Sequence, residues 1–308
     1  MDIQPSHDVR LVVIMLTVNQ REKTMRALES FRAVTSPRFQ LLLWDNGSQD
    51  GTVDAVSEVY PEVTVHYYPT NLGAAAGRNA AAELAIEEFR PSHLLFIDND
   101  MTVAPDCLEA LLKPFEKDSR LAQTTGKIMV PNGNGRLNDA GGCRLQFWLG
   151  RTNPVGHGEF DRGQYDKPTK CIPGGFTLVR TDVFQQVGGF DPLFDPYVYE
   201  DLDFSLRISR TGYYALYIPQ ALAYHDVSQT FENGSYTERY VSQKARNWFL
   251  FMRRHASIVE QLGFIFLGAP YRLVRAVIRE GRQGNLTALY GVQRGFLDFL
   301  KSKAQQGK

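Results

Sequence analysis

The sequence lacks the features that mark several large classes of protein. Its 308 residues contain only three cysteines, which are too few and too scattered for a disulfide framework or a zinc site. No basic and apolar leader follows Met1, so we expect no signal peptide. The longest apolar stretch near the C-terminus, Leu262 to Ala269, is too short to span a bilayer. These absences predict a cytoplasmic protein.

The sequence also has no net charge, because 34 lysines and arginines balance 34 aspartates and glutamates. The balance hides an asymmetry. Residues 240–308 contain 12 basic and 3 acidic residues, so the preceding part of the chain is acidic. A basic segment favours nucleic acid or an anionic membrane surface. We predict no nucleic-acid partner, because no stacking motif or known binding module accompanies the charge.

Strand and helix patterns alternate over the first hundred residues. Residues 10–17, 39–44 and 63–68 have the apolar pattern of buried strands, and helical patterns lie between them. This alternation predicts an α/β protein with a doubly wound, mostly parallel sheet and right-handed crossovers. The dinucleotide fingerprint G-x-G-x-x-G is absent, since Gly73 and Gly77 have another spacing and follow the third strand, which excludes a dehydrogenase.

The predicted central strand covers residues 93–100. Four consecutive apolar residues, Leu94 to Ile97, are typical of a strand covered on both faces. Asp98 and Asp100 follow at its carboxyl end, where ligands bind in open α/β sheets, and strand alternation would direct both to one side. Neighbouring carboxylates repel unless a cation separates them, so they favour a divalent metal that carries a diphosphate. The alternative is that they cap a helix beginning at Pro105.

Three later stretches complete the pattern. Residues 131–169 are rich in Gly, Asn, Asp and Arg, which predicts a long loop that lines an acceptor site. Residues 171–180 predict one strand with a double-glycine break. A helix should begin near Glu200, with acidic residues in its first turn that complement the helix dipole. We adopt this interpretation for Asp203, which also has Arg207 four residues later.

Taken in order, these motifs resemble the inverting family-2 glycosyltransferases of the GT-A fold, over residues 9–230. The resemblance rests on the ordered set more than on any one motif. It implies an α/β GT-A fold, with a Rossmann-like, mostly parallel central sheet flanked by helices and a helical C-terminal extension. The positions that match the family's nucleotide- and donor-binding residues are Thr17, Asn19, Asp45, Arg78, Asp98, Gly174 and Gly175.

The resemblance also implies a metal site and a catalytic base. Asp98-Asn99-Asp100 matches the family's Asp-x-Asp motif, and His225 matches a late histidine that completes the metal shell in many relatives. Asp98, Asp100 and His225 are therefore the expected ligands of Mn²⁺ or Mg²⁺, although a lone histidine is more often a packed core residue. Glu200-Asp201 matches the family's Glu-Asp pair, with Asp201 as the catalytic base and Glu200 as the second catalytic residue.

The reaction explains why these residue types are needed. Displacing a nucleoside diphosphate from a sugar puts negative charge on the leaving oxygen, which a metal can stabilise. A base on the opposite face must take the proton of the acceptor hydroxyl, and in-line attack inverts the anomeric carbon. By resemblance to bacterial rhamnosyltransferase-like enzymes, we expect a UDP- or dTDP-sugar donor and a glycan or lipid-linked saccharide acceptor in cell-envelope polysaccharide biosynthesis.

Two alternatives come from other functional classes. The Asp98 segment also resembles the nucleophile motif of haloacid-dehalogenase-like phosphatases, but those proteins open with that strand, whereas three strand-helix units precede it here. A non-catalytic sugar-nucleotide-binding protein is the other alternative. The presence of both Asp100 and Asp201 argues against it, because a binding protein needs no base.

These assignments divide the chain into three parts. Residues 1–8 form an N-terminal tail, and residues 9–230 form the catalytic domain, with a nucleotide-sugar half (9–130) and an acceptor half (131–230). Residues 231–308 form a basic helical region, with helices predicted over 240–254, over 258–281 with a break at Pro270, and over 286–301. Its amphipathic helices either lie on an anionic membrane, as a peripheral protein on the inner face of the cell membrane, or pack on the catalytic domain.

Overall fold

The computed structural model describes residues 10–132, 135–226, 238–271, 274–275, 278 and 287–306. The predicted tail, residues 1–8, lies outside these residues. The chain forms two compact units, each described separately here. The first consists of Met1–Cys143, Pro154–Asp195 and Glu200–Asp226, and the second of Arg144–Asn153, Pro196–Tyr199 and Val227–Lys308.

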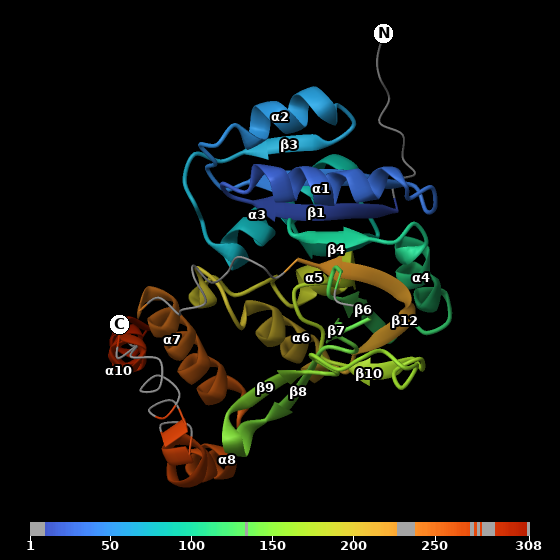
Figure 1. Cartoon of the computed structure of the whole chain (residues 1–308). Coiled ribbons are helices and arrows are strands. Elements are labelled where there is room, and N and C mark those ends of the chain that lie inside the picture. Colours follow the sequence, from blue (N-terminus) through green and yellow to red (C-terminus); the bar gives the residue numbers. More distant parts are fainter. Residues whose placement is uncertain are drawn as a thin grey trace. The chain divides into compact units, whose positions relative to one another are not determined.

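A large sheet forms the middle of the first unit, with the strand order β10-β12-β6-β11-β4-β1-β2-β3 (Figure 1). Two short strands pair outside this order, β5 with β12 and β7 with β6. The strands are β1 (Leu11–Thr17), β2 (Phe39–Asp45), β3 (Thr64–Tyr67), β4 (His93–Asp98), β5 (Met101–Val103), β6 (Leu121–Met129), β7 (Leu137–Asp139), β10 (Thr169–Cys171), β11 (Thr177–Arg180) and β12 (Tyr214–His225). Because β1 is parallel to β2 and β4, and β6 to β12, the sheet is mostly parallel, as predicted.

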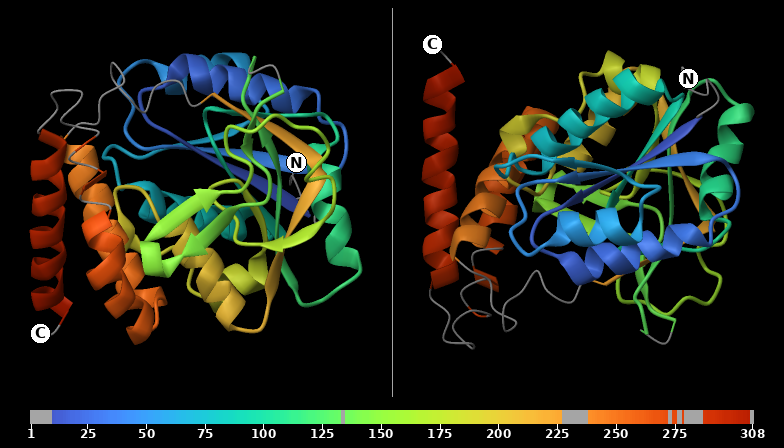
Figure 2. Two further views of the ribbon diagram at one scale, coloured as in Figure 1. Left: turned by 60° about the horizontal axis from the view of Figure 1, so that its bottom comes forward. Right: turned by 90° about the horizontal axis from the view of Figure 1, so that it is seen from above.

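Helices cover both faces of this sheet. The helices on one face are α1 (Arg21–Arg32), α2 (Thr52–Val59) and α4 (Cys107–Leu112), and those on the other are α3 (Ala74–Phe89), α5 (Thr181–Gln186) and α6 (Glu200–Arg210). The right view of Figure 2 shows α1 and α2, in blue, opposite α3, in teal. The two layers explain the apolar runs: in β4, Leu95 and Ile97 pack against one layer, and Leu94 and Phe96 against the other. Two 3₁₀ turns, η1 (Lys113–Glu116) and η3 (Pro192–Phe194), complete the unit.

The connectivity reverses direction at β1. From β1 the chain continues through β2 to β3 on one side, and then returns to β4 on the other side of β1. The carboxyl ends of β1 and β4 therefore form a switch point, which is where ligands bind in open α/β sheets.

Several sequence-based expectations need correction. The helix expected at Pro105 begins at Cys107. The single strand expected over residues 171–180 is two strands, β10 beside β12 and β11 between β4 and β6, because the chain leaves the sheet at Gly174 and Gly175. The expected long loop contains regular structure: β7, β8 (Cys143–Gln146), η2 (Phe147–Leu149), β9 (Arg151–Pro154) and the start of β10.

The local sequence pattern does not indicate β12, the longest strand of the sheet. Pro219 lies inside it, and proline normally argues against a strand interior because it has no N–H to donate. The pairing of β12 with β6 shifts register between Ile218 and Leu222, so Pro219 lies in the irregular part of the ladder. This irregularity lets one strand carry on to His225.

The second unit is largely helical. Its main helices are α7 (Glu238–His255), α8 (Ile258–Gly263), the π-helical turn η5 (Phe264–Gly268) and α10 (Thr287–Gln306). The three predicted stretches are helical where the structure describes them, although parts of residues 272–286 lie outside it. The break predicted at Pro270 is wrong, because residues 269–271 are helical and the irregular turn, η5, lies before the proline. The helices α7 and α10 lie side by side (Figure 2), and at Gly295 an added Cβ would lie 2.3 Å from the carbonyl oxygen of Ser242. Among the described residues, no helix has the length and apolarity needed to cross a bilayer.

Candidate active site

Three of the predicted site residues lie at neighbouring strand ends. Thr17 is the last residue of β1, Asp45 the last of β2 and Asp98 the last of β4. Thr17 pairs with Asp45, and Leu16 with Asp98, in the parallel ladders. The sheet therefore brings these polar residues to one edge, at the switch point.

Asp45 is fully buried, and only one of its two carboxylate oxygens accepts hydrogen bonds. Its Oδ1 accepts hydrogen bonds from the backbone N–H groups of Gly47, at 3.0 Å, and Ser48, at 2.7 Å. Its Oδ2 is buried and accepts no hydrogen bond from the residues that the structure describes. A buried polar atom without a partner is costly, so Asp45 is suited to accept a hydrogen bond from an N–H group of a bound molecule.

Asn19 ties together the loops that follow β1 and β2. Its backbone N–H donates to Ser48 Oγ at 2.8 Å, and its side-chain Oδ1 accepts from the Gln49 N–H at 2.8 Å. Asn19 has a φ of 51°, a conformation that asparagine tolerates better than most residues. The two loops are therefore fixed relative to each other beside Asp45.

The Asp98-Asn99-Asp100 segment is anchored by its middle residue. The Asn99 side chain donates to the hydroxyls of Thr17 and Thr24, both at 3.0 Å, and these hydroxyls are 2.8 Å apart. β4 ends at Asp98, and Asp100 lies in the turn that follows. The expectation that strand alternation directs both carboxylates to one side is therefore wrong, because Asp100 is no longer in the strand.

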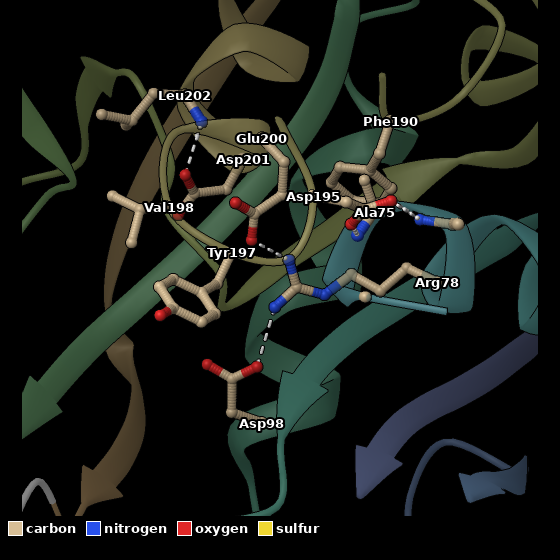
Figure 3. A network of polar contacts seen from close by, with 12 residues as sticks. Ala75, Arg78, Asp98, Phe190, Asp195, Tyr197, Val198, Glu200, Asp201 and Leu202 are labelled. Carbon is tan, nitrogen blue, oxygen red and sulfur yellow. Dashed lines mark hydrogen bonds and ion pairs between the residues drawn. The ribbon is translucent and has the colours of Figure 1, made fainter. Parts of the chain in front are cut away.

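Arg78 joins three elements through a buried ion pair with Glu200 and a partly buried one with Asp98 (Figure 3). It is 6% exposed, its Nη2 lies 2.8 Å from Asp98 Oδ1, and its Nη1 lies 2.8 Å from Glu200 Oε1. Burial alone would lower the pKa of Arg78, but the charges of Asp98 and Glu200 raise it, so the guanidinium stays charged. The contact brings α3, β4 and the start of α6 into one network.

Glu200 and Asp201 begin α6. Burial, together with the charge of Asp201, raises the pKa of Glu200 to about 7, and its Oε2 is buried with no partner among the described residues. Burial also raises the pKa of Asp201, whose Oδ1 accepts the Leu202 N–H at 2.7 Å (Figure 3). A carboxylate with a raised pKa is a stronger base near neutral pH.

Gly174 and Gly175 pass close to the carboxylates. A Cβ on Gly174 would lie 3.3 Å from Asp201 Oδ2, and one on Gly175 would lie 3.2 Å from Asp98 Oδ2. Larger residues would crowd both groups. The two glycines therefore keep open the space between the predicted donor residue Asp98 and the predicted base Asp201.

The predicted pair of Asp203 and Arg207 is confirmed, but it is not a surface pair. Asp203 is 0% exposed and accepts a hydrogen bond from Arg207 Nε at 2.7 Å. Arg207 also donates to the carbonyl oxygens of Val187 and Gly189. The pair ties α6 to the preceding loop.

Asp100, in the turn after β4, lies beside His225, at the end of β12. Asp100 Oδ1 is 3.1 Å from His225 Nε2, and Asp100 Oδ2 is 3.6 Å from Lys23 Nζ. Burial would lower the pKa of His225, but the hydrogen bond and charge of Asp100 outweigh it and raise the pKa. A carboxylate and an imidazole fit a divalent cation that takes its remaining ligands from phosphate and water. In the described part of the chain, no three His, Cys, Asp or Glu side chains are grouped so that they could hold a metal ion by themselves.

Three contributors were not identified from the sequence: Lys23, Thr24 and Asp195. Asp195 accepts hydrogen bonds from the N–H groups of Ala75, at 2.8 Å, and Ala76, at 3.2 Å, at the start of α3 (Figure 3). Its partners are 119 residues or more away in sequence, so no local pattern marks it. Lys23 and Thr24 lie on α1, where spacing shows only the face that packs on the sheet.

Known proteins resemble this chain in sequence. The model of glycosyl transferase family 2 matches residues 12–188, so Glu200, Asp201 and His225 lie beyond the match. The chain is 26% identical over 302 residues to N-acetylglucosaminyl-diphospho-decaprenol L-rhamnosyltransferase of Mycobacterium tuberculosis, covering 91% of this chain and 98% of the relative. It is also 26% identical over 186 residues to glucosyl-dolichyl phosphate glucuronosyltransferase of Haloferax volcanii, covering 59% of this chain and 56% of that protein.

Solved structures share the fold at low sequence identity. The structure of GalNAc-T7 with UDP, GalNAc and Mn²⁺ superposes with a TM-score of 0.60 and 17% identity, covering 78% of this chain and 47% of that one. The mannosyltransferase PcManGT from Pyrobaculum calidifontis, in complex with GDP-Man and Mn²⁺, superposes with a TM-score of 0.57 and 18% identity. This match covers 97% of this chain and 83% of that one. The predicted GT-A fold is thus confirmed.

The family match also decides between the enzyme classes that the sequence left open. A phosphatase of the haloacid-dehalogenase type is excluded, and Asp98, its expected nucleophile, is held by Arg78. The match covers more than half of the chain, and the rhamnosyltransferase relative extends over nearly all of it. The chain is therefore a glycosyltransferase of the GT-A fold, and it belongs to glycosyl transferase family 2.

Proposed function

We propose that this enzyme transfers a sugar, with inversion, from a nucleoside-diphosphate sugar to a hydroxyl group of a lipid-linked saccharide. The observation that carries the proposal is the network in which the buried Arg78 joins Asp98, at the end of β4, to Glu200, next to Asp201. It links the proposed donor-binding strand end directly to Glu200, a carboxylate with a raised pKa that precedes the proposed base Asp201. Donor and base are thus assigned to one network but to separate elements.

The donor half of the proposal rests on Asp45. Its unpartnered Oδ2 can accept the imino N–H of a uracil or thymine base, while Thr17 and Asn19 hold the surrounding loops. A UDP- or dTDP-sugar satisfies this oxygen. The L-rhamnosyltransferase relative supports the choice of a rhamnose-type sugar.

A divalent cation is assigned to Asp100 and His225. The GalNAc-T7 and PcManGT structures both contain Mn²⁺, and the two side chains here offer an oxygen and a nitrogen ligand. When bound, Mn²⁺ or Mg²⁺ supplies positive charge to the leaving diphosphate. Lys23, beside Asp100, adds a further positive charge to the same region. Asp98, which the sequence also suggested as a ligand, is instead given the role of a donor residue that Arg78 orients.

The acid-base step is assigned to Asp201. Its carboxylate takes the proton from the acceptor hydroxyl as the oxygen attacks the anomeric carbon from the face opposite the diphosphate, which inverts that carbon. Glu200 remains bound to Arg78 and keeps the start of α6 in place. Gly174 leaves room for the acceptor beside Asp201.

The acceptor is proposed to be held at a membrane. The two relatives are named for diphospho-decaprenol and dolichyl phosphate substrates, which are lipids. In the second unit, α8 and η5 expose large apolar side chains, among them Ile258, 77% exposed, and Phe266, 73% exposed. Exposed apolar residues beside arginines such as Arg253 and Arg275 suit peripheral binding to an anionic bilayer.

Asp201→Asn tests the assignment most directly. The amide keeps the shape but cannot accept the proton, so transfer should fall by about 10²–10⁴-fold while nucleotide binding survives. Sugar transfer and isothermal titration with the nucleoside diphosphate are measured on the same samples, and the anomeric configuration of the product is read by NMR. Near-normal turnover of Asp201→Asn, or retention of configuration, would refute the proposed mechanism.

A further inference from the structure

The chain reaches Glu200 through a backbone segment that most residues avoid. Val198 and Tyr199 have φ values of 79° and 78°. Positive φ is unfavourable for β-branched and bulky residues, and it persists only where surrounding contacts hold it. The two residues immediately precede Glu200 and Asp201, the first residues of α6. The placement of Asp201 therefore depends on what holds this segment as well as on the Arg78–Glu200 contact.

One buried side chain of α7 holds it. Asn247 is 0% exposed, and its Nδ2 donates to the carbonyl oxygens of Tyr197, at 2.8 Å, and Val198, at 3.2 Å. Its Oδ1 accepts a hydrogen bond from Arg246 Nη1 at 2.8 Å. Because carbonyl oxygens only accept, the NH₂ group must face the segment. Asn247 thus clamps two consecutive peptide groups next to the positive-φ residues.

Aromatic contacts from the same helix reinforce the clamp. Tyr197 stacks on Tyr240 with ring centroids 5.8 Å apart, and Tyr199 stacks on Phe251 at 5.2 Å. Residues 240, 247 and 251 are spaced by seven and four positions, so they lie on one face of α7. That face therefore contacts the segment at three points, and all of these contacts lie within the second unit.

We propose that Asn247 is a positioning residue for the catalytic base. It fixes the peptide groups of Tyr197 and Val198, and through them the backbone direction in which Asp201 enters α6. The inference rests on the function proposed above for Asp201, and it assigns the C-terminal helical region a part in the chemistry. A misplacement of about 1 Å can cost an enzyme about 10²-fold in rate, so loss of the clamp should be readily measured.

Asn247→Leu removes the donors and keeps a side chain of similar size. We expect kcat to fall by about 10–100-fold, with the KM for the donor unchanged, because the donor residues lie on other elements. Trp248→Phe is the matched control. Trp248 is the next residue of α7, is also buried, and donates one hydrogen bond to the carbonyl oxygen of Gly150 at 3.1 Å. Loss of this hydrogen bond should leave kcat within about twofold, since it is made to Gly150 and not to the carbonyl oxygens of Tyr197 and Val198.

A rescue experiment separates positioning from general stability. Glycine adopts positive φ without the penalty that valine carries, so Val198→Gly should restore part of the kcat lost in Asn247→Leu. Asn247→Asp gives a second measure should the leucine variant not fold, because its carboxylate would face the two carbonyl oxygens without a proton to donate. It should show the same loss of kcat at unchanged donor KM.

The outcomes distinguish this inference from the function on which it rests. If Asp201→Asn loses transfer while Asn247→Leu and Asn247→Asp keep full kcat, the clamp is refuted and the base stands. Equal losses in Asn247→Leu and Trp248→Phe, or a loss that appears in donor KM, would refute positioning in favour of a merely structural role. If Asp201→Asn itself turns over normally, the proposed function fails first.

Discussion

Replacing Arg78 with methionine should destabilise the protein markedly. Methionine can fill the space beside the Phe190 ring, which lies 5.5 Å from the guanidinium carbon, but it removes two charged hydrogen bonds of 2.8 Å. Breaking a buried ion pair costs about 3–5 kcal/mol, because the partner is left buried without a counter-charge. The Asp98 side chain is 41% exposed and can be hydrated, whereas that of Glu200 is 8% exposed. We therefore expect Arg78→Met to lower the free energy of unfolding by about 2–4 kcal/mol near neutral pH.

The loss should grow with pH. Even beside Arg78, burial raises the pKa of Glu200 to about 7, from 4.5 for an ordinary glutamate. Without Arg78 that pKa rises further, since a favourable charge is gone. A carboxyl group whose pKa is higher in the folded than in the unfolded protein loses folding free energy as pH rises through this interval. Denaturant unfolding of the parent and Arg78→Met should therefore differ more at pH 8 than at pH 5.

Two further variants make this test specific. Glu200→Gln in the Arg78→Met background removes one of the two buried titrating groups, so the added pH dependence should shrink. The part that remains comes from Asp201, whose pKa is also lowered by the charge of Arg78. Arg32→Met is the surface control, because Arg32 forms exposed pairs with Glu29 and Glu62 and such pairs contribute little. Equal destabilisation of Arg78→Met at both pH values, or destabilisation no larger than that of Arg32→Met, would refute the reasoning.

Three other predictions follow from the site and the surface. EDTA should abolish transfer, Mn²⁺ or Mg²⁺ should restore it, and Asp100→Ala should lose activity and most donor affinity; full activity in EDTA would contradict the metal assignment. Liposome co-sedimentation should require anionic lipid, weaken with salt and fall when Arg253, Arg254 and Arg275 become glutamine, whereas equal binding to neutral vesicles would argue against the membrane role. Asp203→Asn should lower the free energy of unfolding by about 1–3 kcal/mol, because Asp203 is fully buried beside Arg207, yet leave donor affinity intact in a titration.

The sequence by itself determined the central layer of the fold. Four consecutive apolar residues in β4, and a similar run in β1, can be satisfied only between two layers of helices, which is where both strands lie. Parallel strands joined by helices align their carboxyl ends at one edge. The polar residues that end β1, β2 and β4 must therefore lie at that edge, as Thr17, Asp45 and Asp98 do.

Local pattern failed where the backbone departs from regular geometry. The sequence pattern did not indicate β12, because Pro219 argues against a strand. The register shift that accommodates this proline belongs to the pairing of β12 with β6 and cannot be read from one strand alone. The double glycine at 174–175 was expected as a break within one strand, but it separates two strands at different places in the sheet.

Only the tertiary structure decided which charges neutralise one another. Asp98 and Asp100 are two residues apart, yet Asp98 pairs with Arg78, and Asp100 lies beside Lys23 and His225. The second carboxylate that pairs with Arg78, that of Glu200, lies 122 residues away from it in the sequence. Ion pairs form through space with whatever charge the fold brings near, so periodicity and spacing predicted the carboxylates at the strand end but not their partners.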